Sequence, residues 1–256
     1  RTGNSTLTLR GNRTGLGATV GEERVTFTSA PAVNNGTIGT WAVHQGAGTA
    51  NAAHYVTVDG GNNVITAAYS GTGDLDTAAG PTTLFDATGT GGTLTSNRSV
   101  YAFRTDSNVA LAGFTLNVGD ANAATLGQAG FILNNGADIT GIAGSKLNIG
   151  TNALSVYTDD AAVSSINVPI ANYRNNATNT MSNVLTKFGP GTPAMGALGT
   201  FQGGIVVNQG VLSLTAANVI PTFENLNAVT GSIVTIRPGA SVLLNNNNQE
   251  FGNLAA

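Results

Sequence analysis

Carboxylates, histidines and lysines are the side chains of this sequence that could carry chemistry. The acidic ones include three close pairs: Asp74 with Asp76, Asp159 with Asp160, and Glu22 with Glu23. Paired carboxylates can ligate Ca²⁺ or divide the roles of acid and base in glycoside hydrolysis. Asp74-Leu75-Asp76 lies in a Gly-rich segment, where no nearby Glu supplies a bidentate ligand. We therefore interpret it as a solvated loop, with Ca²⁺ binding as the alternative.

The second acidic pair ends a run of β-prone residues, Tyr157-Thr158-Asp159-Asp160. Adjacent residues of a strand point to opposite faces, so the two carboxylates would not converge on one ligand. We favour a turn in which an Asp side chain accepts main-chain hydrogen bonds.

The only two histidines, His44 and His54, both lie between Trp41 and Val58. Such a pair can bind a metal ion or serve as acid and base. The chain contains no Cys, and no nearby Glu completes a set of ligands. We expect partly buried or surface histidines, and we assign no catalytic residue, metal site or cofactor.

Lysines and asparagines offer further possibilities. Lys146 and Lys187 could form isopeptide crosslinks with Asn or Asp, although no partner pattern is visible. The tract Asn245–Asn248 can form a ladder of stacked amides or a plain corner loop, and both interpretations stay open. Asn-x-Ser/Thr sequences, which arise by chance in a chain rich in Asn and Thr, occur at Asn4, Asn12, Asn35, Asn97 and Asn176.

The composition argues against several classes of function. Charged residues make up 9% of the 256 residues, against roughly 25% in ordinary soluble domains. The ten Lys and Arg residues form no basic stripe for nucleic acid, and no apolar run approaches the roughly 18 residues of a membrane span. The hydrophobic fraction of 41% is enough for a core of small residues. Because the chain opens at Arg1-Thr2-Gly3, we expect an interior piece or processed product of a longer polypeptide.

Short apolar segments, cut by Gly or Asn turns, must position these side chains. Examples are Val100–Phe103, Phe114–Val118, Phe131–Leu133 and Leu154–Tyr157. Such strands suit a coil whose circuits stack about 4.8 Å apart through parallel main-chain hydrogen bonds. The loosely repeated pattern is typical of a solenoid, and no 3.6-residue period predicts a helix. Weakly patterned stretches predict two loops, at 70–92 and 171–183.

One region resembles a known family. Leu185-Thr186-Lys187-x-Gly189-x-Gly191-Thr192, followed by Gly203-Gly204-Ile205-Val206-Val207-Asn208-x-Gly210-Val211-Leu212-x-Leu214, is similar to the autotransporter-associated β-strand repeat. Pro238-Gly239-Ala240-Ser241-Val242-Leu243 and Phe251-Gly252-Asn253-Leu254 resemble the rung that usually follows. Pro193-Ala194-Met195 and Gly199-Thr200-Phe201-Gln202 depart from the pattern. The resemblance implies a right-handed parallel β-helix, secreted or surface-displayed, within a longer polypeptide. It does not imply a catalytic activity.

These observations together predict an all-β chain, a right-handed parallel β-helix with irregular loops and almost no helix. Residues 1–92 would form N-terminal rungs with the loop at 70–92, and residues 93–256 would continue them as one solenoid, with the repeat motif at 185–254. The expected location is extracellular or at the cell surface, without nucleic-acid binding or membrane insertion.

The predicted function is a structural rod or fibre module that self-associates through the ends of its coil, rather than an enzyme. One alternative is an adhesin that binds a glycan or matrix ligand through the two loops, with a groove that Tyr55, Tyr69 and Tyr101 would line. The other alternative is a polysaccharide-acting enzyme on the same scaffold.

Overall fold

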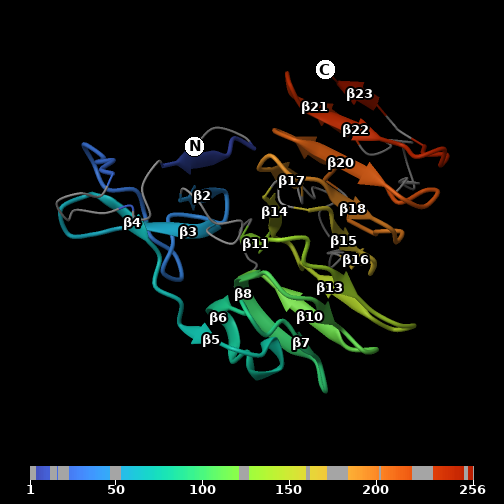
Figure 1. Ribbon diagram of the computed structural model, residues 1–256, viewed down its shortest axis with the longest axis horizontal. Helices are drawn as coiled ribbons and strands as arrows, with labels where there is room; N and C mark the ends of the chain where they lie inside the picture. The colour runs from blue at the N-terminus through green and yellow to red at the C-terminus, as the bar shows by residue number, and fades with distance from the viewer. Residues whose placement is uncertain are drawn as a thin grey trace.

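The computed structural model describes residues 4–11, 16, 23–46, 53–120, 127–159, 162–171, 184–201, 203–220, 233–250 and 253–255. Within them the chain forms three β-sheets, and the one helical segment is a 3₁₀ turn, η1 (Leu75–Thr77) (Figure 1). This confirms the predicted all-β fold with almost no helix. None of the described segments is a helix long and apolar enough to cross a membrane.

The small sheet contains β1 (Leu7–Arg10), β2 (Ala42–Gln45), β3 (Ala53–Val58) and β4 (Val64–Thr66), in that order. β1 and β2 are parallel, but β2 with β3 and β3 with β4 are antiparallel. Between β3 and β4, Asp59 Oδ1 accepts the main-chain N–H groups of Gly61 and Asn63. Tight turns join antiparallel strands, whereas parallel strands need long crossovers. This part therefore differs from the parallel rungs predicted from residue 1 onward.

Every strand pair in the two large sheets is parallel, as predicted. The twelve-stranded sheet contains β5 (Gly71–Thr72), β6 (Gly80–Asp86), β8 (Arg98–Thr105), β10 (Thr115–Val118), β11 (Gln128–Leu133), β13 (Lys146–Asn148), β14 (Ala153–Thr158), β16 (Ile170–Ala171), β17 (Leu185–Phe188), β19 (Ile205–Val207), β21 (Ile233–Ile236) and β23 (Asn253–Ala255). The seven-stranded sheet contains β7 (Gly92–Thr93), β9 (Val109–Ala110), β12 (Ile139–Thr140), β15 (Ser164–Ile166), β18 (Pro193–Met195), β20 (Val211–Leu214) and β22 (Ser241–Leu243).

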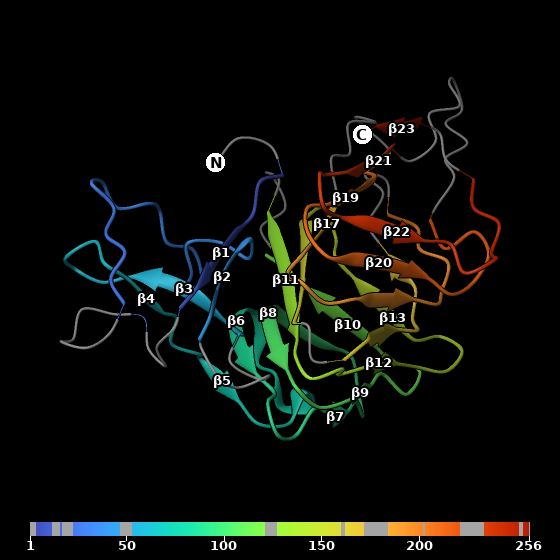
Figure 2. The ribbon, with the colours of Figure 1, turned by 45° about the horizontal axis from the view of Figure 1, so that its top comes forward.

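The chain visits the two large sheets in turn, and each return places a strand beside the strand of the previous circuit. Phe103 on β8 is the register partner of Phe131 on β11, and Phe131 is the partner of Val156 on β14. In the seven-stranded sheet the strands from β7 to β22 succeed one another from green to red (Figure 2).

The twelve-stranded sheet curls because β8 pairs along different parts of its length. Its first half pairs with β10, through Ser99 and Asn117, and its second half pairs with β6 and β11. The branch β10-β13-β16 thus forms a third wall beside the two main stacks, and we call it the side wall.

Several strands of the twelve-stranded sheet are buried on both faces. On β8, Phe103 faces the main apolar core, while Tyr101 and Ala102 belong to a second cluster that also holds Tyr55 of β3. The small sheet therefore packs on the outer face of the large one. Burial on both faces explains why these strands read as continuous apolar runs rather than alternating ones.

The prediction of a loop at 70–92 was wrong. That segment forms β5, η1 and β6, and it reaches β7. Leu75 of η1 is fully buried in the main core, and its N–H donates to Gly91 O just before β7. The Gly, Thr and Asp content of this segment is typical of a loop, but the burial of Leu75 fixes it against the core. Of the second predicted loop, Ala171 ends β16, and residues 172–183 lie outside the described segments.

Candidate functional site

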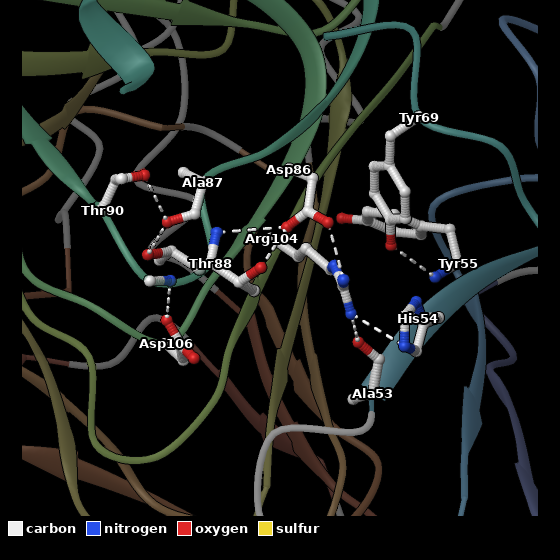
Figure 3. A network of polar contacts seen from close by, with 12 residues as sticks. Ala53, His54, Tyr55, Tyr69, Asp86, Ala87, Thr88, Thr90, Arg104 and Asp106 are labelled. Carbon is white, nitrogen blue, oxygen red and sulfur yellow. Dashed lines mark hydrogen bonds and ion pairs between the residues drawn. The ribbon is translucent and has the colours of Figure 1, made fainter. Parts of the chain in front are cut away.

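A buried polar cluster joins the small sheet to the large one. Arg104 of β8 lies at its centre, with Asp86 of β6 on one side and His54 of β3 on the other (Figure 3). Asp86 and Arg104 are register partners on neighbouring strands, so their side chains leave the sheet side by side. Arg104 Nη2 lies 2.6 Å from Asp86 Oδ2, and the two side chains are only 10% and 15% exposed.

Asp86 is held as a carboxylate by its partners. Burial raises the pKa of Asp86, but hydrogen bonds from Arg104 and Thr88 outweigh it, so that the pKa lies below its ordinary value. The Thr88 hydroxyl and N–H both donate to Asp86 Oδ1, at 2.8 and 3.1 Å. A charge this well compensated has little tendency to take up a proton, which makes Asp86 unsuited to general acid chemistry.

His54 is held neutral by the same guanidinium. Arg104 Nη1 lies 2.9 Å from His54 Nε2. Arg can only donate, so Nε2 accepts and the proton of the neutral ring is on Nδ1. Burial and then the Arg104 charge lower the pKa of His54 to about 4. The guanidinium carbon also lies 4.8 Å from the centre of the Tyr69 ring, a cation–π arrangement.

Other hydrogen bonds tie the small sheet down around this cluster. Tyr157 Oη donates to Gln45 Oε1 at 2.8 Å, and the N–H of Thr40 donates to Gln128 Oε1 at 3.0 Å. Tyr55 Oη donates to Phe103 O at 3.4 Å. These hydrogen bonds join the two sheets. Within the described part of the chain, no group of three His, Cys, Asp or Glu residues is placed to hold a metal ion.

The first predicted acidic pair is used within the fold. Asp74 Oδ1 accepts the N–H of Asp76 and so caps η1. The Asp76 carboxylate accepts the Thr95 N–H and hydroxyl and an Arg98 Nε–H at 2.8 Å. These hydrogen bonds, that of Arg98 first, lower the pKa of Asp76. The pair stabilises the turn that precedes β6.

The second acidic pair is described only at Asp159, since Asp160 lies outside the described segments, as does Glu22. Asp159 is 1% exposed, and its carboxylate accepts the N–H of Asn135, which has a positive φ of 55°. The carboxylate thus stabilises a turn of the preceding circuit. Glu23 forms an isolated parallel bridge with Leu16.

The histidines are brought together, because His44 and His54 are register partners on β2 and β3. His44 is 2% exposed, and burial lowers its pKa. No hydrogen-bond partner for either His44 ring nitrogen is found among the described residues. The two rings belong to the packed junction of the sheets.

The two lysines differ completely in surroundings. Lys146 is exposed on β13, whereas Lys187 on β17 is fully buried. Lys187 Nζ donates to Gly189 O at 2.5 Å and to Gln209 O at 2.7 Å. Burial lowers the pKa of Lys187 to about 7. Both acceptors are main-chain carbonyls at corners of successive circuits, so the amine bridges corners.

Of the two interpretations left open for Asn245–Asn248, the structure shows the corner, and stacked amides occur elsewhere. Asn245 and Asn246 take positive φ values and form a corner, and Asn245 Nδ2 donates to Ser213 Oγ at 2.7 Å. The side-chain amides that stack are those of Asn117 and Asn148, where Asn148 Nδ2 donates to Asn117 Oδ1 at 2.8 Å. Sequence reasoning missed this pair because an amide ladder depends on register between circuits and not on a run of Asn.

The remaining predicted residues are placed as follows. Tyr55 and Tyr101 are 1% and 0% exposed and form core rather than the lining of a groove, and Tyr69 packs against them. Of the five Asn-x-Ser/Thr positions, Asn97 is exposed, Asn4 and Asn35 are half-buried, and Asn12 and Asn176 lie outside the described segments.

Sequence reasoning also missed Asp86 and Arg104, which carry the cluster. Their only signal is a charged residue at the end of an apolar run, and the register that pairs them cannot be read from sequence. Comparison with protein-family models, with curated proteins and with solved structures gives no significant match.

Proposed function

We propose that this chain is a right-handed parallel β-helix that serves as a rigid structural module of a secreted or cell-surface protein. The observation that supports it is the order of the strands: successive circuits add strands to the same two sheets, in parallel and in register. A right-handed sense is the one taken by about 98% of crossovers between parallel strands.

One continuous apolar core supports a mechanical role. It runs from Leu75 in η1 to Val234 in β21. Each circuit is joined to the next by main-chain hydrogen bonds along both large sheets. Bending such a rod would break packing and hydrogen bonds together, which makes it stiff.

The two ends of the stack differ. At the first end, β5 and β7 are two residues long and η1 covers the core with Leu75. At the other end, three apolar side chains are exposed: Ile233 by 51%, Leu243 by 48% and Leu244 by 42%. Leu243 lies on β22, the edge strand of the seven-stranded sheet, Leu244 follows it, and Ile233 lies on β21, next to the edge strand β23. Exposed apolar residues on an edge strand favour pairing with another strand. The proposed self-association therefore uses the β21–β22 end, with a second copy of this chain as the partner.

Sedimentation velocity over a concentration series tests the proposal, with negative-stain microscopy to reveal rods. We expect the wild type to form pairs as the concentration rises. Leu243→Lys places a charge in the contact and should weaken association by about tenfold or more, since about 1.4 kcal/mol corresponds to a factor of ten. Val163→Lys, at a residue 56% exposed beside β15, is the matched control and should associate like the wild type.

A monomer at every concentration, with rods of the expected shape, would retain the structural module and eliminate the self-association. Filaments would mean that the end covered by η1 also accepts a partner.

An adhesin is the second candidate, because the side wall carries a groove whose lining includes the polar side chains of Ser99, Asn117 and Asn148. The polysaccharide-acting enzyme gains no support from four of the described carboxylates, because each accepts hydrogen bonds from within the chain: Asp74, Asp76, Asp86 and Asp159.

A further inference from the structure

A groove of about 240 Å³ lies on the side wall, where β8, β10 and β13 run next to one another. Successive side chains of a strand point to opposite faces of the sheet, and this decides which of them line the groove. Leu116 and Leu147 point into the core, so Asn117 and Asn148, one residue further along each strand, face outward. The volume is below the roughly 300–1,000 Å³ of sites for drug-sized ligands, so it suits one ring of a larger molecule.

Three polar side chains form a ladder across this groove. Ser99, Asn117 and Asn148 are register partners on the three strands. Asn148 Nδ2 donates to Asn117 Oδ1 at 2.8 Å, and Asn117 Nδ2 donates to Arg98 O at 3.1 Å and to Ser99 Oγ at 3.3 Å. These bonds fix the amide orientations before any ligand arrives, which lowers the entropic cost of binding.

The ladder leaves hydrogen-bonding capacity of both kinds. Asn148 Nδ2 has two protons and uses one on Asn117, and the Ser99 hydroxyl accepts a bond from Asn117 and keeps its own proton. Asn152 also lines the groove and is 3% exposed, and its Oδ1 has no partner among the described residues. Donors and acceptors thus lie within a short distance of one another. Val118 and Ile149 also line the groove, but their side chains are buried in the main core.

We propose that this groove binds a neutral, hydroxyl-rich ring, such as one sugar residue of a glycan, with Asn117 and Asn148 as the central ligands. A ring hydroxyl both donates and accepts, which matches a lining that offers both. The inference goes beyond the structural module proposed above and is independent of its self-association.

The lining disfavours other ligand classes. The described lining residues include Asp120 and no Lys, Arg or His, so they offer no countercharge to a phosphate or carboxylate. Its strands are already paired on both sides along the sequence β8-β10-β13-β16, so a peptide could not add itself as a further strand there.

The test is titration of the ¹⁵N-labelled chain with a panel of neutral sugars, followed by NMR of the side-chain amide groups. The panel has two arms: free monosaccharides and polyols, and neutral gluco-, manno- and galacto-oligosaccharides. We expect the Asn117 and Asn148 amide resonances to shift in a saturable way at concentrations around 1–10 mM, since one ring supplies only a few kcal/mol. If free monosaccharides saturate the shifts, the groove binds a single ring. If only the oligosaccharides do so, it binds a ring within a longer glycan.

Variants keep the result specific. Asn148→Ala should weaken binding by about fivefold to tenfold, because it removes a hydrogen bond of about 1 kcal/mol and frees the Asn117 amide. Asn148→Leu should abolish binding by filling the groove. Lys146→Ala, two residues away on the same outward face, is the matched control and should bind like the wild type.

The absence of any amide shift across the whole panel would overturn the proposal, as would equal binding by Asn148→Leu. Retained thermal unfolding transitions in the variants exclude misfolding as the cause of lost binding. Neither result bears on whether the chain forms rods or pairs, which sedimentation decides.

Discussion

At the scale of single residues, burial decides how much an ion pair matters for stability. Two Asp–Arg pairs illustrate it. Asp76–Arg98 and Asp86–Arg104 have similar distances, 2.8 and 2.6 Å, but Arg98 is 29% exposed and Arg104 is 10% exposed. An exposed pair contributes up to about 1 kcal/mol, whereas removal of one partner from a buried pair leaves an uncompensated charge.

Arg104→Gln should therefore lower the free energy of unfolding by roughly 3–5 kcal/mol, because Asp86 stays buried without its cation. Arg98→Gln, the matched control, should lower it by about 1 kcal/mol or less. Urea unfolding followed by circular dichroism measures both. Equal losses for the two variants would mean that burial does not distinguish the two pairs.

At the scale of elements, corners decide the fold as much as strands do. Gly210 has a positive φ of 73°, and an added Cβ would lie 2.5 Å from Lys187 Nζ and 2.6 Å from Gly189 O. Gly239 has a similar φ of 81°, but a Cβ there would meet nothing within 4 Å. Both residues follow the Gly-turn pattern of the sequence, yet only one corner is crowded.

Gly239→Ala should cost only the backbone strain of a positive φ, about 1–2 kcal/mol. Gly210→Ala adds a clash with the amine that bridges two corners, so it should cost at least about 2 kcal/mol more. Thermal unfolding of the two variants measures the difference. A Gly210→Ala variant no less stable than Gly239→Ala would show that the corner can shift to make room.

The difference between local composition and register between circuits explains how much of the fold could be predicted. Val100–Phe103, Phe131–Leu133 and Leu154–Tyr157 were predicted as apolar strands, and they lie within β8, β11 and β14. Local composition is enough there, because burial on both faces demands apolar residues. It fails for β6, which begins Gly80-Pro81-Thr82-Thr83. The pairing of β6 with β8 is irregular between Gly80 and Leu84, and the in-register part begins only at Leu84. The Asp86–Arg104 pair and the Asn117–Asn148 ladder depend on register between circuits, which no local pattern encodes.

At the scale of the whole molecule, two bodies of different design share one interface. The small sheet is mostly antiparallel, and the large sheets are parallel. Their contact includes the Tyr-rich cluster around Tyr55, Tyr101 and Tyr157, and the polar group around Arg104. Because His54 lies in this contact, its protonation should change how strongly the small sheet is held to the large one.

Acid should weaken this attachment. The pKa of His54 falls from about 6.5 in the unfolded chain to about 4 in the folded one, so the unfolded chain binds more protons between these values. Stability is thus full above pH about 6.5 and falls as the pH drops to about 4, by on the order of 2–3 kcal/mol for this group. His44, Asp76 and Asp86, whose pKa values are also lowered, change stability in the same direction.

The contribution of His54 is isolated by His54→Gln. Guanidinium unfolding at pH 7 and pH 4.5 should give a smaller loss on acidification for the variant than for the wild type. Hydrogen exchange at pH 4.5 should show faster exchange in β2 and β3 than in β11 and β14. Uniform exchange in all four strands would mean that the small sheet does not open by itself.

The 3₁₀ turn that carries Leu75 has a consequence for assembly. This turn covers one end of the core, so the proposed self-association leaves each chain only one end through which it can pair. A particle with a single adhesive end forms pairs and then stops, so its association saturates instead of proceeding to unlimited growth. On this proposal, Leu75→Asp would uncover the second end of the core, and a variant that still folds should form longer assemblies than pairs.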